Sequence, residues 1–549
     1  MQGKGNMMNY KTLALSVALA MTLIGCGDGD DGAAGAQGIQ GAQGEQGTAG
    51  ADGQPGRDFS EVKTWYSSAA AAVARASTTN FSETAGKAKN VILFVGDGMG
   101  ISTLTASRIL EGQLAGEMGE DNRLSFETFP HVGLVKTYSS NQQTSDSAPT
   151  MTALVTGVKT KDGLLSVTDA AVRSNCASMQ GQELVTSLML AEMAGMSTGI
   201  ISTARLTHAT PAATYAHSVN RDWEADSNMP AQAITDGCKD IAAQLIDFNY
   251  GNGLEVALGG GRSYFTPDTD VDPEYGSNGR RKDGRNLTSE WTSKYSNSAY
   301  IWNRDQFMNV DTSTTDHLLG LFEPSHMQYE ADRADDAGGE PSLAEMTSRS
   351  LDILKRNDKG YFLMVEAGRI DHAHHGGNAA RALHDTIALS DAVQVAMAKA
   401  GPDTLILVTA DHSHVFTIAG YPTRGNPILG LVRGNNADGK PANGYDTDAN
   451  GMPYTTLGYA NGLGFGSGNS PLNMDAQRPD LNLYDVTHID FRQEATVPLG
   501  SETHAGEDVA VYAKGPGASL VSGSIEQHAL FHVMERAAGL IARAEAAQP

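Results

Sequence analysis

The apolar residues of this chain gather in short continuous runs, and stretches with helical periodicity lie between them. Continuous apolarity, in contrast to alternation, predicts strands that are buried on both faces, as in a parallel sheet. These runs cover residues 90–95, 198–203, 361–365, 404–409 and 508–513. The helical stretches cover residues 183–194, 343–355, 378–400 and 525–546. Such alternation of strands and helices predicts an α/β sandwich.

Three further segments do not follow this alternation. The Ala/Ser/Thr-rich residues 59–89 predict an N-terminal helical segment, with its helix over 61–76. Residues 425–499 are rich in Gly, Asn, Asp and Pro and lack a helical period, which predicts a small inserted subdomain or a set of long loops. Residues 268–303 are polar and predict a surface excursion.

The N-terminus has the pattern of an export signal. Lys11 precedes an apolar run over residues 13–24, which is too short to span a bilayer. The run leads into Leu23-Ile24-Gly25-Cys26, which resembles a bacterial lipobox. We therefore predict a lipoprotein signal peptide over residues 1–25 and a lipid-modified Cys26, and hence an exported protein that is anchored to the membrane in the periplasm or on the outer cell surface. The alternative is an ordinary secretory peptide in which this cysteine is incidental.

Glycine occupies every third position from Gly29 to Gly56. Only glycine fits the axis of a collagen triple helix, so this strict period indicates a collagen-like Gly-X-Y tract within residues 26–58. The tract is short and contains a single proline, Pro55, which leaves two alternatives: a flexible spacer or a trimeric stalk. In either case it would hold the folded body away from the membrane.

The net charge limits the possible binding partners, and the cysteine content bears on a disulfide. The 549 residues carry a formal net charge of −25, which argues against nucleic acid as a specific partner. The same charge means that any phosphate site needs cations of its own nearby. Besides Cys26 the chain has Cys176 and Cys238, and an exported protein allows for these either one disulfide or two buried free thiols.

Carboxylate and imidazole side chains follow the predicted strands, where open α/β sheets place their sites. Asp97 lies in a glycine-rich turn after the first strand, and Asp411-His412 follows the run at 404–409. Asp371 and His375 are four residues apart, so one helical turn would place both on one face.

Two more ligands and a nucleophile complete the candidate chemistry. His504 adds a third imidazole, so that the carboxylates and imidazoles suffice for two zinc ions, and the oxygen of Glu366 better suits magnesium. Ser147 begins a predicted helix, whose N-terminal field favours an anionic oxygen. No histidine-based triad is evident, so a neighbouring zinc ion would have to activate this hydroxyl; the alternative is that Ser147 only caps the helix.

Taken together, these motifs resemble those of alkaline phosphatases, and of the animal-type (tissue-nonspecific or placental-like) members more than the enterobacterial ones. The motifs that carry the resemblance are Gly96-Asp97-Gly98-Met99-Gly100, Thr144-Ser145-Asp146-Ser147-Ala148-Pro149, Glu366 to His375, Ala410 to His414, and Glu502 to Gly506. The resemblance spans about residues 90–528. It implies a three-layer α/β sandwich, in which a central, largely parallel sheet is flanked by helices. It also implies a phosphatase domain over 90–549 with a small crown-like insertion at about 425–499, and a homodimer.

The resemblance implies a role for each matching residue. It places the metal ligands in three sets, namely Asp371, His375 and His504 for one zinc ion, Asp97, Asp411 and His412 for a second, and Asp97, Thr210 and Glu366 for magnesium. Ser147 would be the nucleophile, and Arg221 would grip two phosphate oxygens with its planar fork. Three histidines would lie just outside the ligands, namely His208, His372 and His414.

Two further matches are with the animal-type members alone. Phe322 and Glu323, with Asp236 and Glu340, resemble a calcium site of those members, although the last two exchange carboxylate lengths there. Cys176 and Cys238 fall at positions that are paired in the same relatives, which implies the disulfide.

The implied function is an exported alkaline phosphatase that hydrolyses small phosphate monoesters through a zinc-activated serine and a phosphoserine intermediate. One alternative is a sulfatase or phosphodiesterase of the same superfamily. Ser147 and Pro149 begin the sulfatase pattern Ser-x-Pro-x-Arg, but Met151 stands where that pattern has arginine. Another alternative is a surface scaffold lipoprotein built around the Gly-X-Y tract, which leaves the ligand set unexplained. The oligomeric state stays open, because a family-like dimer and a collagen-like trimer have clashing symmetries.

Overall fold

The computed structural model describes residues 60–79, 88–464 and 478–547. The predicted signal peptide (1–25), the candidate lipidation site Cys26 and the Gly-X-Y tract lie outside these residues. None of the helices in the described part of the chain combines the length and the apolarity needed to cross a bilayer.

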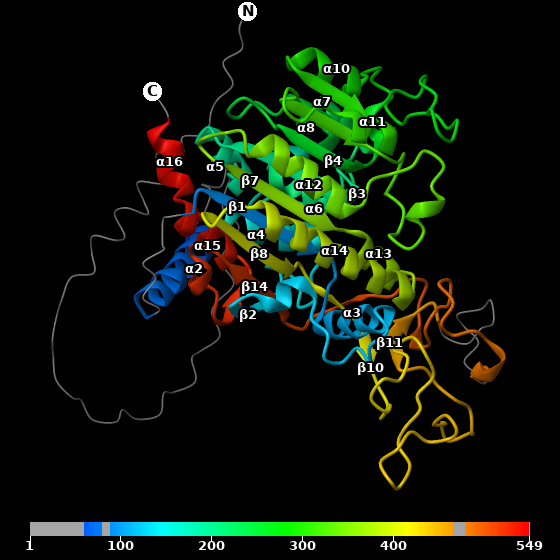
Figure 1. The fold of residues 1–549 in the computed structure, drawn as a ribbon. Coiled ribbons are helices and arrows are strands. Elements are labelled where there is room, and N and C mark those ends of the chain that lie inside the picture. Colours follow the sequence, from blue (N-terminus) through cyan, green and yellow to red (C-terminus); the bar gives the residue numbers. More distant parts are fainter. Residues whose placement is uncertain (1–59, 80–87, 465–477, 548–549) are drawn as a thin grey trace, which may run out of the picture.

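A ten-stranded sheet forms the centre of the molecule, with its strands in the order β15-β2-β14-β8-β1-β7-β3-β4-β6-β5 (Figure 1). All neighbours are parallel except at β14, which pairs antiparallel with both β8 and β2. The strands are β1 (Asn90–Gly96), β2 (His131–Lys136), β3 (Ser197–Arg205), β4 (Val256–Gly260), β5 (Ser298–Ile301), β6 (His317–Leu321), β7 (Tyr361–Ala367), β8 (Thr404–Ala410), β14 (Val509–Lys514) and β15 (Gly523–Glu526). The predicted α/β fold with a largely parallel central sheet is confirmed.

Helices cover both faces of this sheet and make the three layers (Figure 1). One layer contains α3 (Ile101–Leu114), α12 (Leu343–Leu354), α13 (Arg369–His375) and α14 (Ala379–Lys399). The other contains α4 (Ser147–Thr156), α5 (Ser187–Met193), α6 (Ala209–Tyr215), α15 (Ala529–Ala538) and α16 (Leu540–Ala546), with α2 (Ser60–Thr79) packed on α15. The other α-helices of the described residues are α7 (Ala231–Thr235), α8 (Ile241–Asp247), α9 (Arg262–Phe265), α10 (Leu287–Lys294) and α11 (Arg304–Asn309).

The clearest sequence signals are found at the centre of the sheet. The runs at 90–95, 198–203, 361–365 and 404–409 are β1, β3, β7 and β8, which are neighbours. Every residue of β1, β7 and β8 is buried, which explains why their apolar runs are continuous. The helices predicted at 343–355 and 378–400 are α12 and α14. Asn378 begins α14 by accepting a hydrogen bond from the backbone N–H of Arg381 at 2.9 Å.

Several predicted elements need correction. The run at 508–513 is β14, but it runs antiparallel, because continuous apolarity reports burial on both faces and not direction. The continuous helix predicted over 525–546 is wrong. Its first residues belong to β15, and Gly539, with a φ of 63°, separates α15 from α16. The helix predicted from residue 183 begins only at Ser187, where the Thr186 hydroxyl accepts from the backbone N–H of Met189.

The surface excursion predicted over 268–303 is wrong in part. Its last residues form β5, the edge strand of the central sheet. Arg281 is fully buried and pairs with Asp240, with 2.9 Å between Nη1 and Oδ1. A polar composition therefore concealed a segment that is folded around a buried ion pair.

The segment at 425–499 supplies part of a second sheet. β10 (Phe416–Ile418), β11 (Leu457–Gly462) and β12 (Ala495–Pro498) form three strands in this order. A separate hydrophobic cluster joins this small sheet to α3 and α14 through residues that include Leu110, Leu383, Phe416 and Tyr459. Residues 465–477 lie outside the described part of the chain.

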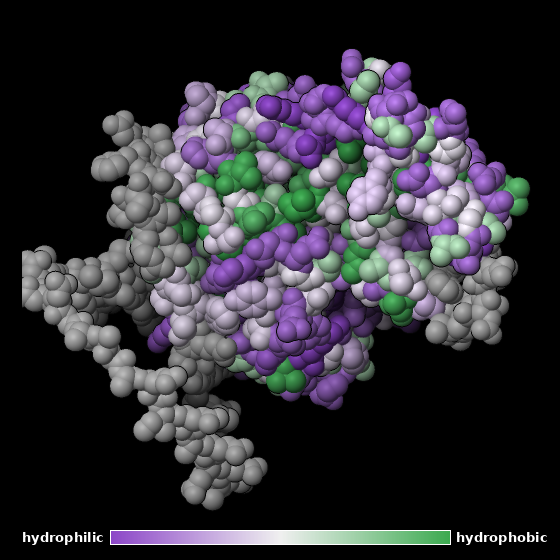
Figure 2. Space-filling model, turned by 90° about the horizontal axis from the view of Figure 1, so that it is seen from below, coloured by the Kyte–Doolittle hydropathy of each residue, from purple (hydrophilic) through white to green (hydrophobic). Residues whose placement is uncertain are grey.

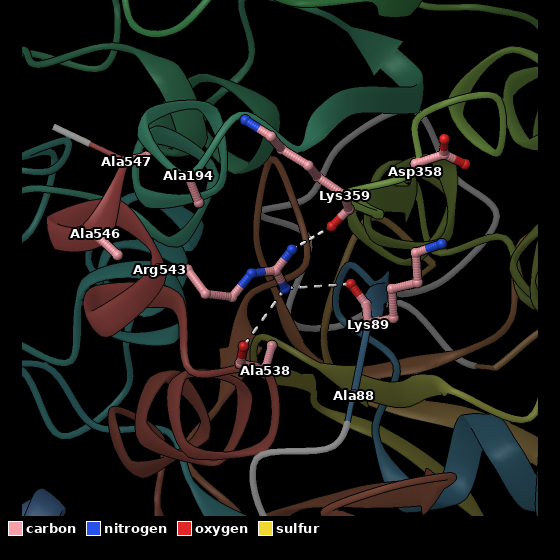
Figure 3. A pocket seen from close by; sticks show the side chains of 9 residues that line it. All are labelled: Ala88, Lys89, Ala194, Asp358, Lys359, Ala538, Arg543, Ala546 and Ala547. Atoms are coloured by element: carbon pink, nitrogen blue, oxygen red, sulfur yellow. Dashed lines mark hydrogen bonds between the residues drawn. The ribbon is translucent and has the colours of Figure 1, made fainter. Parts of the chain in front are cut away.

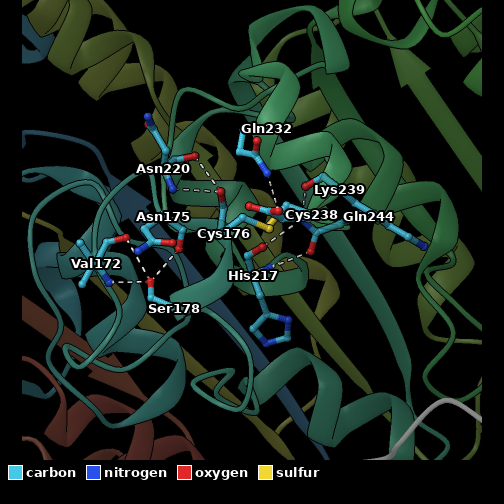
Figure 4. The surroundings of a disulfide bond; sticks show 12 residues. Val172, Asn175, Cys176, Ser178, His217, Asn220, Gln232, Cys238, Lys239 and Gln244 are labelled. Carbon is cyan, nitrogen blue, oxygen red and sulfur yellow. Dashed lines mark hydrogen bonds between the residues drawn. A yellow bond between two sulfur atoms is a disulfide. The ribbon is translucent and has the colours of Figure 1, made fainter. Parts of the chain in front are cut away.

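Cys176 and Cys238 form a disulfide that closes a loop with a sequence separation of 62 residues (Figure 4). Both cysteines belong to a small hydrophobic cluster with Trp223, apart from the main core. The disulfide that the family resemblance implies is therefore present.

Replacing both cysteines by serine should lower the free energy of unfolding by about 2–5 kcal/mol, because the loop that the bond closes in the unfolded chain is long. Urea unfolding of the wild type and the double variant measures this loss. As a matched control, a reductant should lower the midpoint of the wild type and leave the variant unchanged. Equal midpoints under oxidising conditions would contradict the prediction.

Candidate active site

The carboxyl ends of three adjacent strands bring carboxylates together. β1 lies between β7 and β8 in parallel register, so that its last residue stands opposite the last residues of both. Asp97 and Asp411 therefore leave the sheet at the same level, and Glu366 is the penultimate residue of β7. All three side chains are fully buried.

The candidate ligands converge in three groups, within each of which the ligand atoms lie within 4.8 Å of one another. These groups are Asp371, His375, His414 and His504; Asp97, Asp411 and His412; and Asp97, His208 and Glu366. The structure thus brings together residues from five distant motifs. It also moves two histidines inward: His414 and His208, which the resemblance placed just outside the ligands, lie within groups.

The imidazoles of the first group are oriented by hydrogen bonds on their outer side. His375 donates from Nδ1 to the carbonyl of Glu502 at 2.6 Å, and His504 donates from Nδ1 to the carbonyl of Ser145 at 2.7 Å. In this tautomer each Nε2 keeps its lone pair, and each lies 3.3 Å from Oδ1 of Asp371. Two free nitrogen lone pairs and a carboxylate oxygen facing one another are a donor set that suits zinc.

His414 supports this group as a cation. It donates from Nε2 to Asp371 at 2.8 Å and from Nδ1 to Glu502 at 2.5 Å. Burial acts to lower the pKa of His414, but these two carboxylates raise it to about 9. The contact needs a glycine at position 98, where φ is 69° and an added Cβ would lie 2.4 Å from the His414 ring.

The second group contains the serine. Ser147 Oγ lies 3.1 Å from Nε2 of His412 and 3.4 Å from Oδ1 of Asp97. Asp411 is held by the backbone N–H groups of Gly98 (3.0 Å) and His412 (2.9 Å). Burial, followed by repulsion from Asp411, raises the pKa of Asp97 well above its usual range. A cation at this point would relieve both effects.

The third group shows the clearest fit to a cation. Burial raises the pKa of Glu366 to about 7. Five buried polar atoms in and beside the second and third groups have no hydrogen-bond partner, namely Asp97 Oδ2, Glu366 Oε1, Thr210 Oγ1, His208 Nδ1 and His412 Nδ1. Native proteins leave few such atoms unsatisfied, so their concentration here fits bound metal ions.

Arg221 supplies the local cation that an acidic protein needs for phosphate. Its Nη1 lies 3.3 Å from Oδ2 of Asp146, which caps the helix that Ser147 begins. Its Nη2 lies 3.2 Å from Nε2 of His208. The guanidinium therefore stands beside the serine and the third group.

The candidate calcium residues are only partly brought together. Glu323 forms a carboxylate group with Glu274 and Asp336, within 4.8 Å of one another. Glu340 adjoins this group, since Glu323 and Asp336, after burial, raise its pKa to about 9. Phe322 directly precedes Glu323 and is buried. Asp236 does not belong: it is exposed at the end of α7, where Gln232 donates to it at 2.8 Å. Glu274 lies beside Glu323, where the family resemblance implied Asp236.

Sequence reasoning also missed residues that hold the ligands. Ser202 donates to Glu366, and Gln527 donates to the carbonyl of Asp411 at 2.6 Å. Glu502 holds both His414 and His375. Ser202 is a polar residue within the apolar run of β3, which is a usable signal, whereas Gln527 is distant in sequence and carries none.

A cleft of about 610 Å³ lies at the amino ends of β1 and β7, opposite the carboxyl ends that carry the candidate ligands (Figure 3). Lys89, Lys359 and Arg543 line it together with alanines and Asp358. The guanidinium of Arg543 donates to the backbone carbonyls of Lys89, Lys359 and Ala538. Among the described residues that line this cleft there is no histidine and a single carboxylate, Asp358, and the cleft is separate from the candidate metal-ligand groups.

Comparison with known proteins identifies the relatives of the chain. A family model described as alkaline phosphatase matches residues 88–540. The tissue-nonspecific alkaline phosphatase of Homo sapiens is 46% identical over 459 residues, which cover 82% of this chain and 84% of that protein. The alkaline phosphatase of Gadus morhua is 44% identical over 459 residues, which cover 82% of this chain and 92% of that protein.

Solved structures agree in fold. The alkaline phosphatase of Thermus thermophilus superimposes with a TM-score of 0.59 at 24% identity, covering 84% of this chain and 93% of that one. The enzyme of the Antarctic bacterium TAB5 gives a TM-score of 0.55 at 21% identity, covering 82% of this chain and 99% of that one. A variant of the TAB5 enzyme, with the same TM-score and identity and covering 82% and 98%, is described with Mg bound.

Asp97→Asn should stabilise the metal-free protein, because the amide removes the repulsion between Asp97 and its neighbouring carboxylates. We expect the free energy of unfolding in a chelator to rise by about 1–2 kcal/mol. The rise in Tm on adding zinc should shrink, because the variant lacks an oxygen shared by two groups. Unfolding with EDTA and with excess zinc and magnesium measures both.

The exposed Asp358→Asn is the matched control and should leave both quantities unchanged. An Asp97→Asn protein that gains as much Tm from zinc as the wild type would contradict the role of this carboxylate.

Proposed function

Because the chain belongs to the alkaline phosphatase family and is a phosphoric monoester hydrolase, we propose that it acts through Ser147 with two zinc ions and one magnesium ion. The observation that carries this proposal is the position of the Ser147 hydroxyl, 3.1 Å from His412 and 3.4 Å from Asp97 within a buried ligand group.

The residues of the three groups, together with Thr210, would supply the ligands of each ion. Asp371, His375 and His504 would hold one zinc ion, and Asp97, Asp411 and His412 would hold the second. Asp97, Glu366 and Thr210 would hold magnesium, with His208 close by. Bound zinc supplies a Lewis acid that lowers the pKa of a nearby hydroxyl or water and offsets the negative charge of the reacting phosphoryl group.

Each residue of the chain then has its own role in the reaction. Ser147 Oγ attacks phosphorus, and Arg221 holds two of the phosphoryl oxygens with its planar fork. The bond to the leaving alcohol breaks and a phosphoserine forms. Water hydrolyses the phosphoserine, which releases phosphate and restores the hydroxyl. Asp146 supports both partners, because it pairs with Arg221 and caps the helix of Ser147.

A fourth cation is proposed at the carboxylate group of Glu274, Glu323 and Asp336, with Glu340 adjoining. Oε2 of Glu340 is buried without a partner, and burial raises the pKa of Glu323 to about 7. An all-oxygen set of this kind suits calcium.

We also propose a homodimer that forms through the end of the central sheet. On β2, Val132 and Leu134 point to solvent and are 50% and 41% exposed. Figure 2, which looks at this lower side of Figure 1, shows hydrophobic surface gathered there. Tyr421, 90% exposed, belongs to the loop that contacts Met118 near the end of α3. An apolar face of this kind, which none of the described helices covers, fits a second copy.

Export and lipid anchoring at Cys26 are proposed from the sequence pattern, and the disulfide supports export. The signal pattern and the Gly-X-Y tract precede the described body, whose disulfide suits an oxidising compartment. The two rivals are less well supported. In the sulfatase pattern an arginine would stand at Met151, which is fully buried within α4, and a scaffold would not require the buried ligand groups.

Ser147→Ala should lower kcat for p-nitrophenyl phosphate by about 10³-fold or more, because the covalent route is lost. Zinc content, measured on the same sample, should stay near that of the wild type. Ser145→Ala, two residues away, is the control and should keep most of the activity. Near-normal turnover by Ser147→Ala would overturn the mechanism.

Metal removal tests the cofactors directly. Activity on p-nitrophenyl phosphate across pH should fall to background after chelation and return only when zinc and magnesium are both restored. Parallel rates on a phosphodiester and a sulfate ester should be lower than on the monoester by about 10²-fold or more. A preference for the sulfate ester or the diester would favour the rival enzyme class.

Leu134→Glu should shift the protein from dimer to monomer, because it places a charge in a contact that excludes water. Analytical ultracentrifugation measures the change, and Val271→Glu, an exposed apolar residue of the 268–303 segment, is the control. A dimer that Leu134→Glu leaves intact would move the interface elsewhere.

A further inference from the structure

The N-terminal helix α2 is held on the body of the protein by one of its faces (Figure 1). Among its described side chains Ala69 and Val73 are buried, and Trp65 and Tyr66 are half-buried. Their spacing of three and four residues places these side chains on one helical face. Two small aliphatic side chains bury little apolar area, so any polar group in this contact weighs heavily in its stability.

Two histidines of the body lie against this face. The ring of Trp65 meets that of His528 edge-on, with 5.7 Å between the ring centroids, and Tyr66 meets His532 in the same way at 4.6 Å. His528 directly precedes α15 and His532 lies within it, so one helical turn presents both rings to α2. Their residues are only 1% and 4% exposed. We call His528 and His532 the histidine pair.

Both imidazoles are buried with unused hydrogen-bonding capacity. Among the described residues, neither nitrogen of His528 has a hydrogen-bond partner, and Nε2 of His532 has none either. An imidazolium carries a charge and a second N–H donor, and both need a partner or water. Burial under α2 therefore favours the neutral form of both rings.

The charged neighbours of His528 come from the body of the protein. Nζ of the buried Lys159 lies 3.3 Å from Oε2 of Glu526, and Lys136 pairs with the other oxygen of Glu526 at 3.0 Å. Glu526 is thus shared between two lysines. Burial, followed by the charge of Lys159, lowers the pKa of His528 to about 4, against smaller opposing effects of Glu526 and of the Trp65 backbone.

The other member of the pair is influenced mainly by the first. Burial, followed by repulsion from His528, lowers the pKa of His532 to about 3, against a smaller opposing effect of the Tyr66 backbone. Further titratable side chains at this contact are Tyr66 itself, Glu535 and the exposed Lys63. Burial, and then Glu535, raise the pKa of Tyr66, so its hydroxyl stays neutral and offers the ring no negative charge.

We propose that the histidine pair makes the docking of α2 a proton-operated switch: in acid the two imidazoles take up protons, and α2 leaves α15. This switch goes beyond the proposed function, because it concerns the attachment of the body and not the reaction. In the sequence α2 follows the predicted Gly-X-Y tract (26–58). Its release would therefore add the 20 residues of α2 to the connection between the body and the predicted anchor.

The direction of the switch follows from the number of protons bound. Once α2 leaves and water reaches the rings, the pKa of each histidine returns toward its ordinary value of about 6.5. The docked state thus binds fewer protons than the released state. Docking is therefore strongest above about pH 6.5 and weakens as the pH falls from there toward about 4. In this window each histidine weakens the docking equilibrium by up to about tenfold per pH unit, and the pair by up to about 100-fold.

Amide hydrogen exchange of α2 tests the switch in the full-length protein with zinc and magnesium present. The protection of residues 60–79 is compared at about pH 7.5 and about pH 5.5, after correction for the intrinsic pH dependence of exchange. We expect this protection to fall about 100-fold, because both histidines take up protons within that interval. Residues 343–354, which form α12, are the internal reference and should stay protected.

Matched variants separate the histidine pair from other titrating groups. Glutamine takes up no proton, so His528→Gln and His532→Gln should each reduce the fall to about tenfold, and the double variant should abolish it. His488→Gln, which changes an exposed histidine, is the control and should keep the full fall. Each ratio is taken within one protein, so a variant that docks α2 less tightly at both pH values still reports the pH dependence.

Several outcomes would overturn the switch. One is a wild-type α2 that is unprotected at the higher pH or fully protected at the lower one. Another is a double variant that keeps the full fall, because other groups would then be responsible. Loss of protection in α12 together with α2 would also count against it, since acid would then unfold the body. If α2 of the double variant is unprotected at both pH values, the single variants decide, and an undiminished fall in both overturns the switch.

Discussion

The central constraint on this structure is a cluster of buried carboxylates at the carboxyl ends of β7, β1 and β8. Asp97 belongs to two of the three ligand groups and is fully buried, with Asp411 and Glu366 delivered by the strands on either side. Such charges are expensive to bury unless cations offset them. The parallel register of β7, β1 and β8 therefore has two consequences. It builds the core, and it brings together carboxylates whose mutual repulsion bound cations would offset.

The second requirement is that the ligands point correctly, and backbone carbonyls provide much of this orientation. The carbonyls of Ser145 and Glu502 fix the tautomers of His504 and His375. His374 lies on α13 between Asp371 and His375. It forms hydrogen bonds with the hydroxyl of Thr103 of α3 (3.0 Å) and with the hydroxyl of Tyr459 of β11 (2.8 Å). The small second sheet is thereby tied to the helix that carries Asp371, which links an irregular part of the chain to the site.

Much of this could be read from the sequence, because the relevant signals are local. Continuous apolar runs located β1, β7 and β8, since burial on both faces excludes polar residues from both. The spacing of Asp371 and His375 placed both on one helical face. Direction and breaks were less accessible: the antiparallel β14 has the same composition as a parallel strand, and the end of α15 depends on one residue, Gly539, whose left-handed conformation composition does not reveal.

The sequence by itself determined the family, the central strands and the candidate ligand side chains, because the signal for each of these lies within a few neighbouring residues. Only the tertiary structure decided which distant side chains meet. It placed Glu274 and not Asp236 beside Glu323, and it made Gln527 a support of Asp411. These outcomes depend on how loops that follow different strands pack together. Such contacts join residues that are far apart in the sequence, so no local pattern predicts them.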